Sequence, residues 1–128
     1  FEDRIKQHLN LEQSLPAVGQ GALGIEIRAN DHEINELIEP LTHNKTLTEV
    51  SAERAMNATL QGGCSVAIGA FAAINGSDLT LSGMVGNVNS GAILKVEECG
   101  AVTQPKDLGI KVANKLLSLG ARELLIEA

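Results

Sequence analysis

Aromatic residues are almost absent from this 128-residue sequence: they make up 2%, as two phenylalanines, with no tryptophan and no tyrosine. Proteins that bind single-stranded nucleic acid stack the bases on aromatic side chains, and such a platform is missing here. The formal net charge of −6 also argues against nucleic acid, which attracts basic surfaces. We therefore expect no nucleic-acid partner, and a core built from Ala, Val, Ile and Leu.

Long apolar runs, a signal peptide and a starting methionine are also missing. No run reaches the roughly 20 residues that a membrane-spanning helix needs, so we expect no membrane partner. The sequence opens in FEDRIKQHL, whose apolar residues at four-residue spacing indicate a helix already under way. We interpret the chain as a fragment or a processed piece of a longer protein.

Cysteine is scarce, whereas hydrophobic residues are plentiful. Hydrophobic residues make up 44% of the chain, which is enough for a packed core and argues against disorder. Cys64 and Cys99 are the only thiols, a number typical of a reduced, cytoplasmic protein rather than of one held by disulfides.

The first third of the chain contains one strand pattern and one helix pattern. The apolar residues of ALGIEIRA, residues 22–29, alternate with other residues, which predicts a strand with one buried face. Asp31 is placed to cap the helix that follows, and Pro40 should help to end that helix.

From residue 43 onward the patterns predict helix, three strands and helix. Strands are expected at residues 65–74, 78–86 and 92–99. Asn75-Gly76 is a strong signal for a hairpin turn between the first two, and Pro105 should open the last long helix. We therefore predict an α+β fold, in which helices cover one face of a three-stranded antiparallel sheet.

The helix before the first of these strands has predicted boundaries. The segment TLTE, residues 46–49, has the form of a capping box, in which the Thr46 hydroxyl and the Glu49 carboxylate each satisfy a backbone N–H. Gly62 is placed to end the same helix in a left-handed conformation.

Two familiar kinds of site are disfavoured by their context. The segment GQGALG, residues 19–24, matches the dinucleotide pattern G-x-G-x-x-G, but that site needs a strand before the glycines and a helix after them. Here the glycines precede the expected strand, although their backbone amides could still serve an anionic ligand. His8, His32 and His43 are not spaced with cysteines or carboxylates in a recognised zinc pattern, so we expect no metal.

Cys64 follows two glycines in LQGGCSVAIG, between a predicted helix and a predicted strand, so its thiol should lie on a loop. It could be a structural thiol that is simply buried. It could be a redox cysteine, although a helix C-terminus disfavours a thiolate. It could also anchor a ligand covalently, since the glycines let a ligand approach. The residues alone leave all three interpretations open.

Three segments, PAVGQGALGIEIR, AERAMNATLQGGCSVAIGA and GAREL, resemble the porphobilinogen deaminase (hydroxymethylbilane synthase) family in order and spacing. The family pattern around the thiol is a helix with Glu-Arg, a Gly-Gly-Cys loop and a strand. The positions that match it are Glu53, Arg54, Asn57, Gly62, Gly63, Cys64 and Val66. Two positions depart from the pattern: Gln61 stands where an acidic residue is usual, and Ala67 where proline is usual.

The resemblance implies a transferase that condenses four porphobilinogen units into hydroxymethylbilane, in tetrapyrrole and haem biosynthesis. It implies that Cys64, next to Gly63, carries a dipyrromethane cofactor through a thioether. It also implies that Gln20 and Gly21 meet carboxylates of the cofactor or substrate. The family's catalytic aspartate and substrate-binding arginines are absent from this sequence, so no catalytic residue is expected here.

The resemblance also implies a division into domains. Residues 1–15 resemble the end of domain 2, residues 16–42 the strand and helix that return to the α/β domain 1, and residues 43–128 domain 3, which anchors the cofactor. The implied partners are porphobilinogen, the growing polypyrrole, and domains 1 and 2 of the same protein, which should be monomeric and cytoplasmic. Each pyrrole carries two carboxylates, so a chain at −6 should need a basic surface from elsewhere.

Two other classes of function remain as alternatives. A stand-alone interaction domain with an incidental loop cysteine predicts an unmodified Cys64 and no affinity for pyrroles. A thiol-dependent redox protein predicts a low pKa for the Cys64 thiol and its reversible oxidation.

Overall fold

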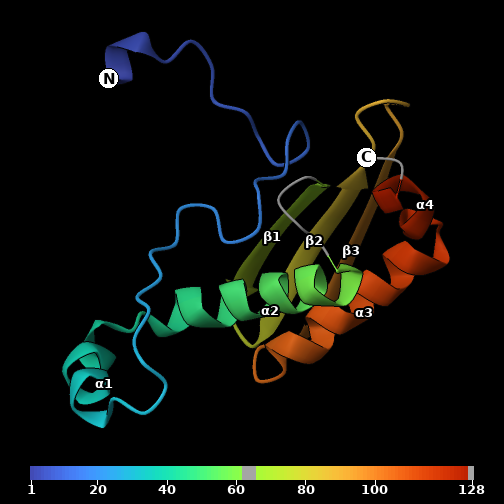
Figure 1. Ribbon diagram of the computed structural model, residues 1–128. Coiled ribbons are helices and arrows are strands. Elements are labelled where there is room, and N and C mark those ends of the chain that lie inside the picture. The colour runs from blue at the N-terminus through green and yellow to red at the C-terminus, as the bar shows by residue number, and fades with distance from the viewer. Residues whose placement is uncertain (62–65, 127–128) are drawn as a thin grey trace.

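The computed structural model describes residues 1–61 and 66–126. A three-stranded antiparallel sheet, in the order β1-β2-β3, is covered by helices on one face (Figure 1). The strands are β1 (Ala67–Asn75), β2 (Asp78–Gly86) and β3 (Ile93–Ala101). The covering helices are α2 (Asn44–Leu60), α3 (Pro105–Ser118) and α4 (Ala121–Ile126). The predicted α+β class is confirmed.

The strands and the last long helix lie close to their predicted positions. Strand β2 has the predicted bounds, and Pro105 opens α3. The hairpin turn falls one residue later than predicted, because Asn75 still pairs with Asp78 and the loop is Gly76-Ser77. Gly76 has φ +65°, a conformation in which glycine costs little.

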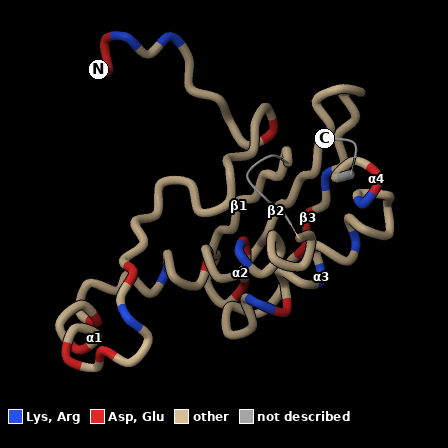
Figure 2. The backbone as a smooth tube through the Cα atoms, in the orientation of Figure 1, with Lys and Arg blue, Asp and Glu red and all other residues tan. Residues whose placement is uncertain are grey.

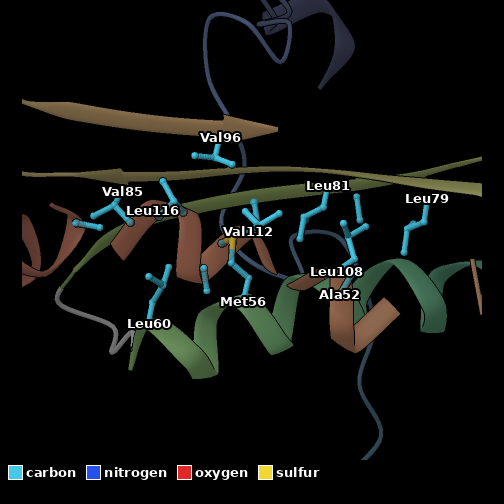
Figure 3. Packing of buried hydrophobic residues seen from close by; sticks show 14 residues of the cluster. Ala52, Met56, Leu60, Leu79, Leu81, Val85, Val96, Leu108, Val112 and Leu116 are labelled. Carbon is cyan, nitrogen blue, oxygen red and sulfur yellow. The ribbon is translucent and has the colours of Figure 1, made fainter. Parts of the chain in front are cut away.

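The core lies between the sheet and the pair α2 and α3 (Figure 3). Its largest fully buried side chains are Met56, Leu79, Leu81, Val85, Val112 and Leu116. With no aromatic residue among them, close packing depends on small residues where the layers meet. A Cβ atom on Gly83 of β2 would lie 2.9 Å from a methyl carbon of Val112. A Cβ atom on Gly109 of α3 would overlap the carbonyl oxygen of Ala52 in α2.

The crossing of α2 and α3 therefore requires glycine at position 109. Alanine within a helix is normally more stable than glycine by about 1 kcal/mol. In Gly109→Ala the overlap at Ala52 outweighs this gain, and the free energy of unfolding should fall by about 1–3 kcal/mol in urea denaturation. Gly24→Ala is the control, because nothing lies within 4 Å of a Cβ atom there. Equal stability of the two variants would contradict the packing described.

Residues 22–29 form no strand, so the prediction for ALGIEIRA is wrong. Leu23 is 100% exposed, and Ile25 and Ile27 are also exposed. A strand needs a neighbour that accepts and donates backbone hydrogen bonds, and within the described residues this segment pairs with none. The alternating pattern reports the two faces of a segment but cannot supply its partner.

The helix that follows, α1 (His32–Ile38), was predicted. Asp31 caps it by accepting the N–H of Ile34 at 3.3 Å. Pro40 lies in the short 3-10 helix η2 (Glu39–Leu41), directly after α1, and a further 3-10 turn, η1 (Glu2–Arg4), lies near the N-terminus. Helix α1 lies apart from the sheet (Figure 1).

The predicted capping box at the start of α2 is not formed. The helix begins at Asn44, and the Thr46 hydroxyl pairs with Nδ1 of His43 at 2.8 Å. The Glu49 carboxylate instead accepts the N–H of Ile74 in β1 at 3.1 Å. A partner from another element thus replaces the local one that the sequence pattern predicted.

Glu98 of β3 lies on the side of the sheet that α3 covers. Lys111 Nζ lies 2.7 Å from its carboxylate, and Lys115 donates to the other carboxylate oxygen. These hydrogen bonds lower the pKa of Glu98 from 4.5 to about 2. The neighbouring Glu97 faces the opposite side, as strand alternation predicts, and accepts from the Ser82 hydroxyl at 2.6 Å.

The Glu98 ion pairs should make stability depend on pH in the acid range. A carboxylate whose pKa is lowered on folding stabilises the fold above its unfolded pKa, near 4.5, and this contribution is lost as the pH falls towards 2. In urea denaturation, the wild type should therefore lose more stability between these two pH values than Glu98→Gln does. Parallel pH profiles for the two proteins would contradict this assignment.

Candidate functional site

Residues 62–66, which include Cys64, connect the end of α2 to the start of β1 in the sequence, and we call this segment the thiol loop, as the sequence predicts. Gly63 and Cys64 lie outside the described residues, so their placement stays a prediction. Gln61 has the left-handed conformation, with φ 57°, that was predicted for Gly62, which also lies outside the described residues. Strand β1 begins at Ala67. The structure therefore fixes where the thiol loop leaves the helix and where it enters the sheet.

Residues 16–21, called here the glycine loop, run along the free edge of β1. Ala17 forms an antiparallel bridge with Gly69. The carbonyl oxygen of Pro16 accepts the N–H of Ala70 at 2.9 Å. Both contacts lie near the start of β1, so the glycine loop lies beside the part of the strand that comes directly from the thiol loop.

Gln20 and Gly21 are presented by two consecutive turns. The Gln20 N–H donates to the Ala17 carbonyl at 3.0 Å, and the Ala22 N–H donates to the Gly19 carbonyl at 3.1 Å. Both Gln20 and Gly21 are exposed, and the Gly21 N–H has no hydrogen-bond partner in the described part of the chain. An exposed amide side chain and an open backbone N–H are suitable donors for a carboxylate.

One buried carboxylate, that of Glu53, ties the glycine loop to α2 and β1. Its Oε1 accepts the N–H of Ala72 at 2.9 Å, and its Oε2 accepts the N–H of Gly19 at 2.8 Å. The residue is only 6% exposed. Burying a carboxylate costs several kcal/mol unless hydrogen bonds compensate, and here two backbone donors do so.

The sequence pattern alone assigned Glu53 no role, although it contained a signal. Glu49 and Glu53 are four residues apart on one face of α2, where their like charges repel each other and destabilise the helix. Such a pair indicates that each carboxylate has a hydrogen-bond donor outside the helix. Both partners are backbone N–H groups at the free edge of β1. The outward N–H groups of Ala70, Ala72 and Ile74 are thus all bonded within the chain.

A pocket of about 990 Å³ lies between the glycine loop, α1 and α2. Gly19 and Gly21 line it from the loop, and Val50, Arg54 and Asn57 line it from α2. Arg54 is exposed and forms no ion pair within the described residues. Its guanidinium group and the open Gly21 N–H make this pocket suitable for an anionic group.

Charged side chains are absent from both loops and concentrated elsewhere. Residues 13–25 and 55–77 contain no Asp, Glu, Lys, Arg or His. Figure 2 shows acidic residues gathered around α1, where Asp31, Glu33, Glu36 and Glu39 lie. The two loops therefore hold no carboxylate that would repel an anionic ligand. They also hold no Lys or Arg side chain, so cationic groups that bind the ligand strongly must come from elsewhere.

The second thiol, Cys99, is exposed and unpaired on β3, opposite Thr80. The thiol loop enters the sheet at Ala67, at the end where β3 begins with Ile93. Six residues of strand separate that end from Cys99, a distance of about 20 Å. Cys99 therefore lies far from the flanks of the thiol loop.

Two further kinds of feature are absent from the part of the chain that the structure describes. There, no three His, Cys, Asp or Glu side chains gather in an arrangement that could hold a metal ion. No helix of that part is both long and apolar enough to cross a membrane.

Two family models match the chain: "Porphobilinogen deaminase, C-terminal domain" over residues 47–118, and "Porphobilinogen deaminase, dipyromethane cofactor binding domain" over residues 1–36. The porphobilinogen deaminase of Ruthia magnifica subsp. Calyptogena magnifica is 57% identical over 125 residues, which cover 98% of this chain and 41% of that protein. The porphobilinogen deaminase of Vesicomyosocius okutanii subsp. Calyptogena okutanii is 54% identical over the same shares. The chain thus spans about two fifths of the length of these relatives.

Proposed function

The chain belongs to the porphobilinogen deaminase family, and we propose that it is the cofactor-anchoring part of a hydroxymethylbilane synthase. The full-length protein then condenses four porphobilinogen units into hydroxymethylbilane, in tetrapyrrole biosynthesis. Cys64 holds the dipyrromethane primer through a thioether. The family match over residues 47–118 supports this most strongly, because it includes the thiol loop together with the helix and strand on either side.

The described residues on either side of the proposed site suit a dipyrromethane. When bound, this group supplies the free pyrrole carbon from which the product chain grows. Its carboxylates find donors in the exposed Gln20 side chain and the open Gly21 N–H, while the uncharged residues 13–25 and 55–77 offer no repelling group. Gly63, directly before Cys64, leaves room for a pyrrole to approach the backbone.

The thiol forms the tether in one substitution. The Cys64 sulfur bonds to the methylene carbon of a pyrrole whose amino group leaves as ammonia, and the thiol gives up its proton. The resulting thioether is not a disulfide, so thiol reagents do not reverse it. Cys64 acts only as a holder afterwards, and the proton transfers of each condensation fall to groups outside this chain.

The domain division supports the same proposal. We propose that residues 1–15 end domain 2, residues 16–42 return to domain 1 and residues 43–128 form domain 3. One family model ends at residue 36 and the other begins at residue 47, so the break between them lies near the proposed boundary at residue 42, whereas the first model runs on through residue 15. Domains 1 and 2 then supply the basic surface that binds the polyanionic product, in a monomeric, cytoplasmic enzyme that uses neither nucleic acid nor a membrane.

The proposed anchor makes a prediction about mass. In the full-length protein, the peptide that contains Cys64 should be heavier by two linked pyrrole units, and the adduct should survive a reducing agent. Cys64→Ala should abolish the adduct and the activity but leave the fold intact, because a loop side chain contributes little packing. Peptide mass spectrometry measures the adduct, an assay for hydroxymethylbilane measures the activity, and circular dichroism checks the fold.

Cys99→Ala serves as the matched control, since Cys99 is the other thiol and is itself exposed. The adduct should remain in this variant. An adduct on Cys99, or an unmodified Cys64 in an active enzyme, would contradict the proposal. An unmodified Cys64 together with no affinity for pyrroles would favour the interaction domain, and reversible oxidation would favour the redox protein.

The proposal also predicts that the isolated 128-residue chain does not consume porphobilinogen. The aspartate that moves protons and the arginines that bind substrate are expected in domains 1 and 2. An assay for hydroxymethylbilane, with the full-length enzyme as the positive control, should find no product. Measurable turnover by the chain alone would show that the catalytic groups have been placed wrongly.

A further inference from the structure

Glu53 joins three segments of the described structure by hydrogen bonds. It belongs to α2, its Oε1 accepts the N–H of Ala72 in β1, and its Oε2 accepts the N–H of Gly19 in the glycine loop. Helix α2 leads into the thiol loop and β1 leads out of it. The carboxylate thus connects both flanks of the thiol loop to the residue that precedes Gln20.

We infer that Glu53 is a positioning residue that holds Gln20 and Gly21 at a fixed place relative to the end of α2 and the start of β1, the two elements that flank Cys64 in the sequence; the inference rests on the proposed function. Its role is to keep the carboxylate donors of the glycine loop in register with the tethered cofactor. It touches neither cofactor nor substrate itself, because its side chain is buried and both of its oxygens are already bonded to backbone N–H groups.

The bond to Gly19 matters because it is the last contact with the rest of the fold at this end of the glycine loop, after the packing of Val18 against the core. The loop's start is fixed by the Ala17 bridge to Gly69 and by the Pro16 carbonyl. Beyond Gly19, the described hydrogen bonds of residues 20–27 reach only near neighbours in the sequence. Glu53 therefore provides the last long-range anchor before Gln20.

The two donors require a carboxylate in particular. Each oxygen of Glu53 accepts one N–H, whereas glutamine offers one oxygen and one NH₂ group. In Glu53→Gln, the NH₂ group would face a backbone donor, so either the loop or the strand loses its bond. The side chain keeps its size, so the core packing is preserved.

Glu49 offers a matched control one turn earlier on the same helix. It also accepts a backbone N–H of β1, that of Ile74, at 3.1 Å, and Lys45 lies 3.8 Å away. No described hydrogen bond links it to the glycine loop. In Glu49→Gln the amide oxygen can still accept the Ile74 N–H, so this variant should remove a carboxylate from the same face of α2 while leaving Gln20 in place.

The test compares the full-length enzyme with its Glu53→Gln and Glu49→Gln variants, each kept well below its unfolding temperature. Glu53→Gln should raise the KM for porphobilinogen by about tenfold with a smaller change in kcat, because it displaces groups that orient carboxylates. Hydrogen exchange at Gln20 and Ala22, whose N–H groups are bonded within the glycine loop, should become faster in the same variant. Glu49→Gln should change the KM by less than about twofold and leave these amides unaffected.

The results that would overturn the positioning role of Glu53 differ from the result that would overturn the proposed function. Faster exchange in Glu53→Gln with a wild-type KM would overturn the positioning role, as would equal losses in both variants, which indicate a stability effect alone. A wild-type enzyme without a pyrrole adduct on Cys64 would instead overturn the proposed function, whatever Glu53 does.

If Glu53→Gln does not fold, Glu53→Asp replaces it. Its carboxylate is shorter by one methylene group and reaches only one of the two N–H groups. The KM should rise in the same direction by a smaller factor, with faster exchange in the glycine loop. A folded Glu53→Asp enzyme with a wild-type KM would overturn the inference.

Discussion

An edge strand exposes backbone N–H groups that must find acceptors, and the way β1 meets this need shapes the rest of the structure. Its outward donors are bonded by the Pro16 carbonyl and by the carboxylates of Glu53 and Glu49. Helix α2 is thus held to the strand by polar bonds at the edge, in addition to the packing of Met56 and Leu60 beneath the sheet. The same bonds use the backbone N–H groups to which another strand could otherwise pair. The neighbour of β1 at this edge is therefore the glycine loop and not a fourth strand.

This edge of β1, called here the sealed edge because its outward N–H groups are bonded within the chain, links the core to the proposed site. Because the chain has almost no aromatic residues, α2 packs closely through small contacts such as that at Gly109, and its end is held in a defined place on the covered face of the sheet. The thiol loop begins at that end and returns into β1, beside the glycine loop. Under the proposed function, a tethered, growing chain of pyrroles would need such a fixed origin, because the reacting carbon would move away from the anchor with each addition while the sulfur stayed in place. Under the same proposal, the net charge of −6 would leave the binding of carboxylates mainly to other domains.

Much of the sheet and its helices could be predicted because the signals are local. Strand β2 follows from its alternation and turn residues, and α3 from Pro105 and its apolar stripe. The prediction of a strand at residues 22–29 was wrong, because the sequence pattern does not show whether a partner strand is present, and the described chain supplies none. The capping box failed because Glu49 bonds to a residue 25 positions away. The motif resemblance predicted the two loops of the proposed site, but the bonds of Glu53 span 34 and 19 positions, and no local pattern shows them.

The most direct test of the sealed edge is the detection of the hydrogen bonds themselves. Scalar couplings across hydrogen bonds, measured by NMR on labelled protein, should connect the amide nitrogens of Ala72 and Gly19 to the carboxylate carbon of Glu53. Couplings between β1 and β2 backbones in the same spectra serve as the internal standard. We predict that both side-chain couplings are present alongside the backbone ones. Their absence from spectra that show the β1–β2 couplings would contradict the account.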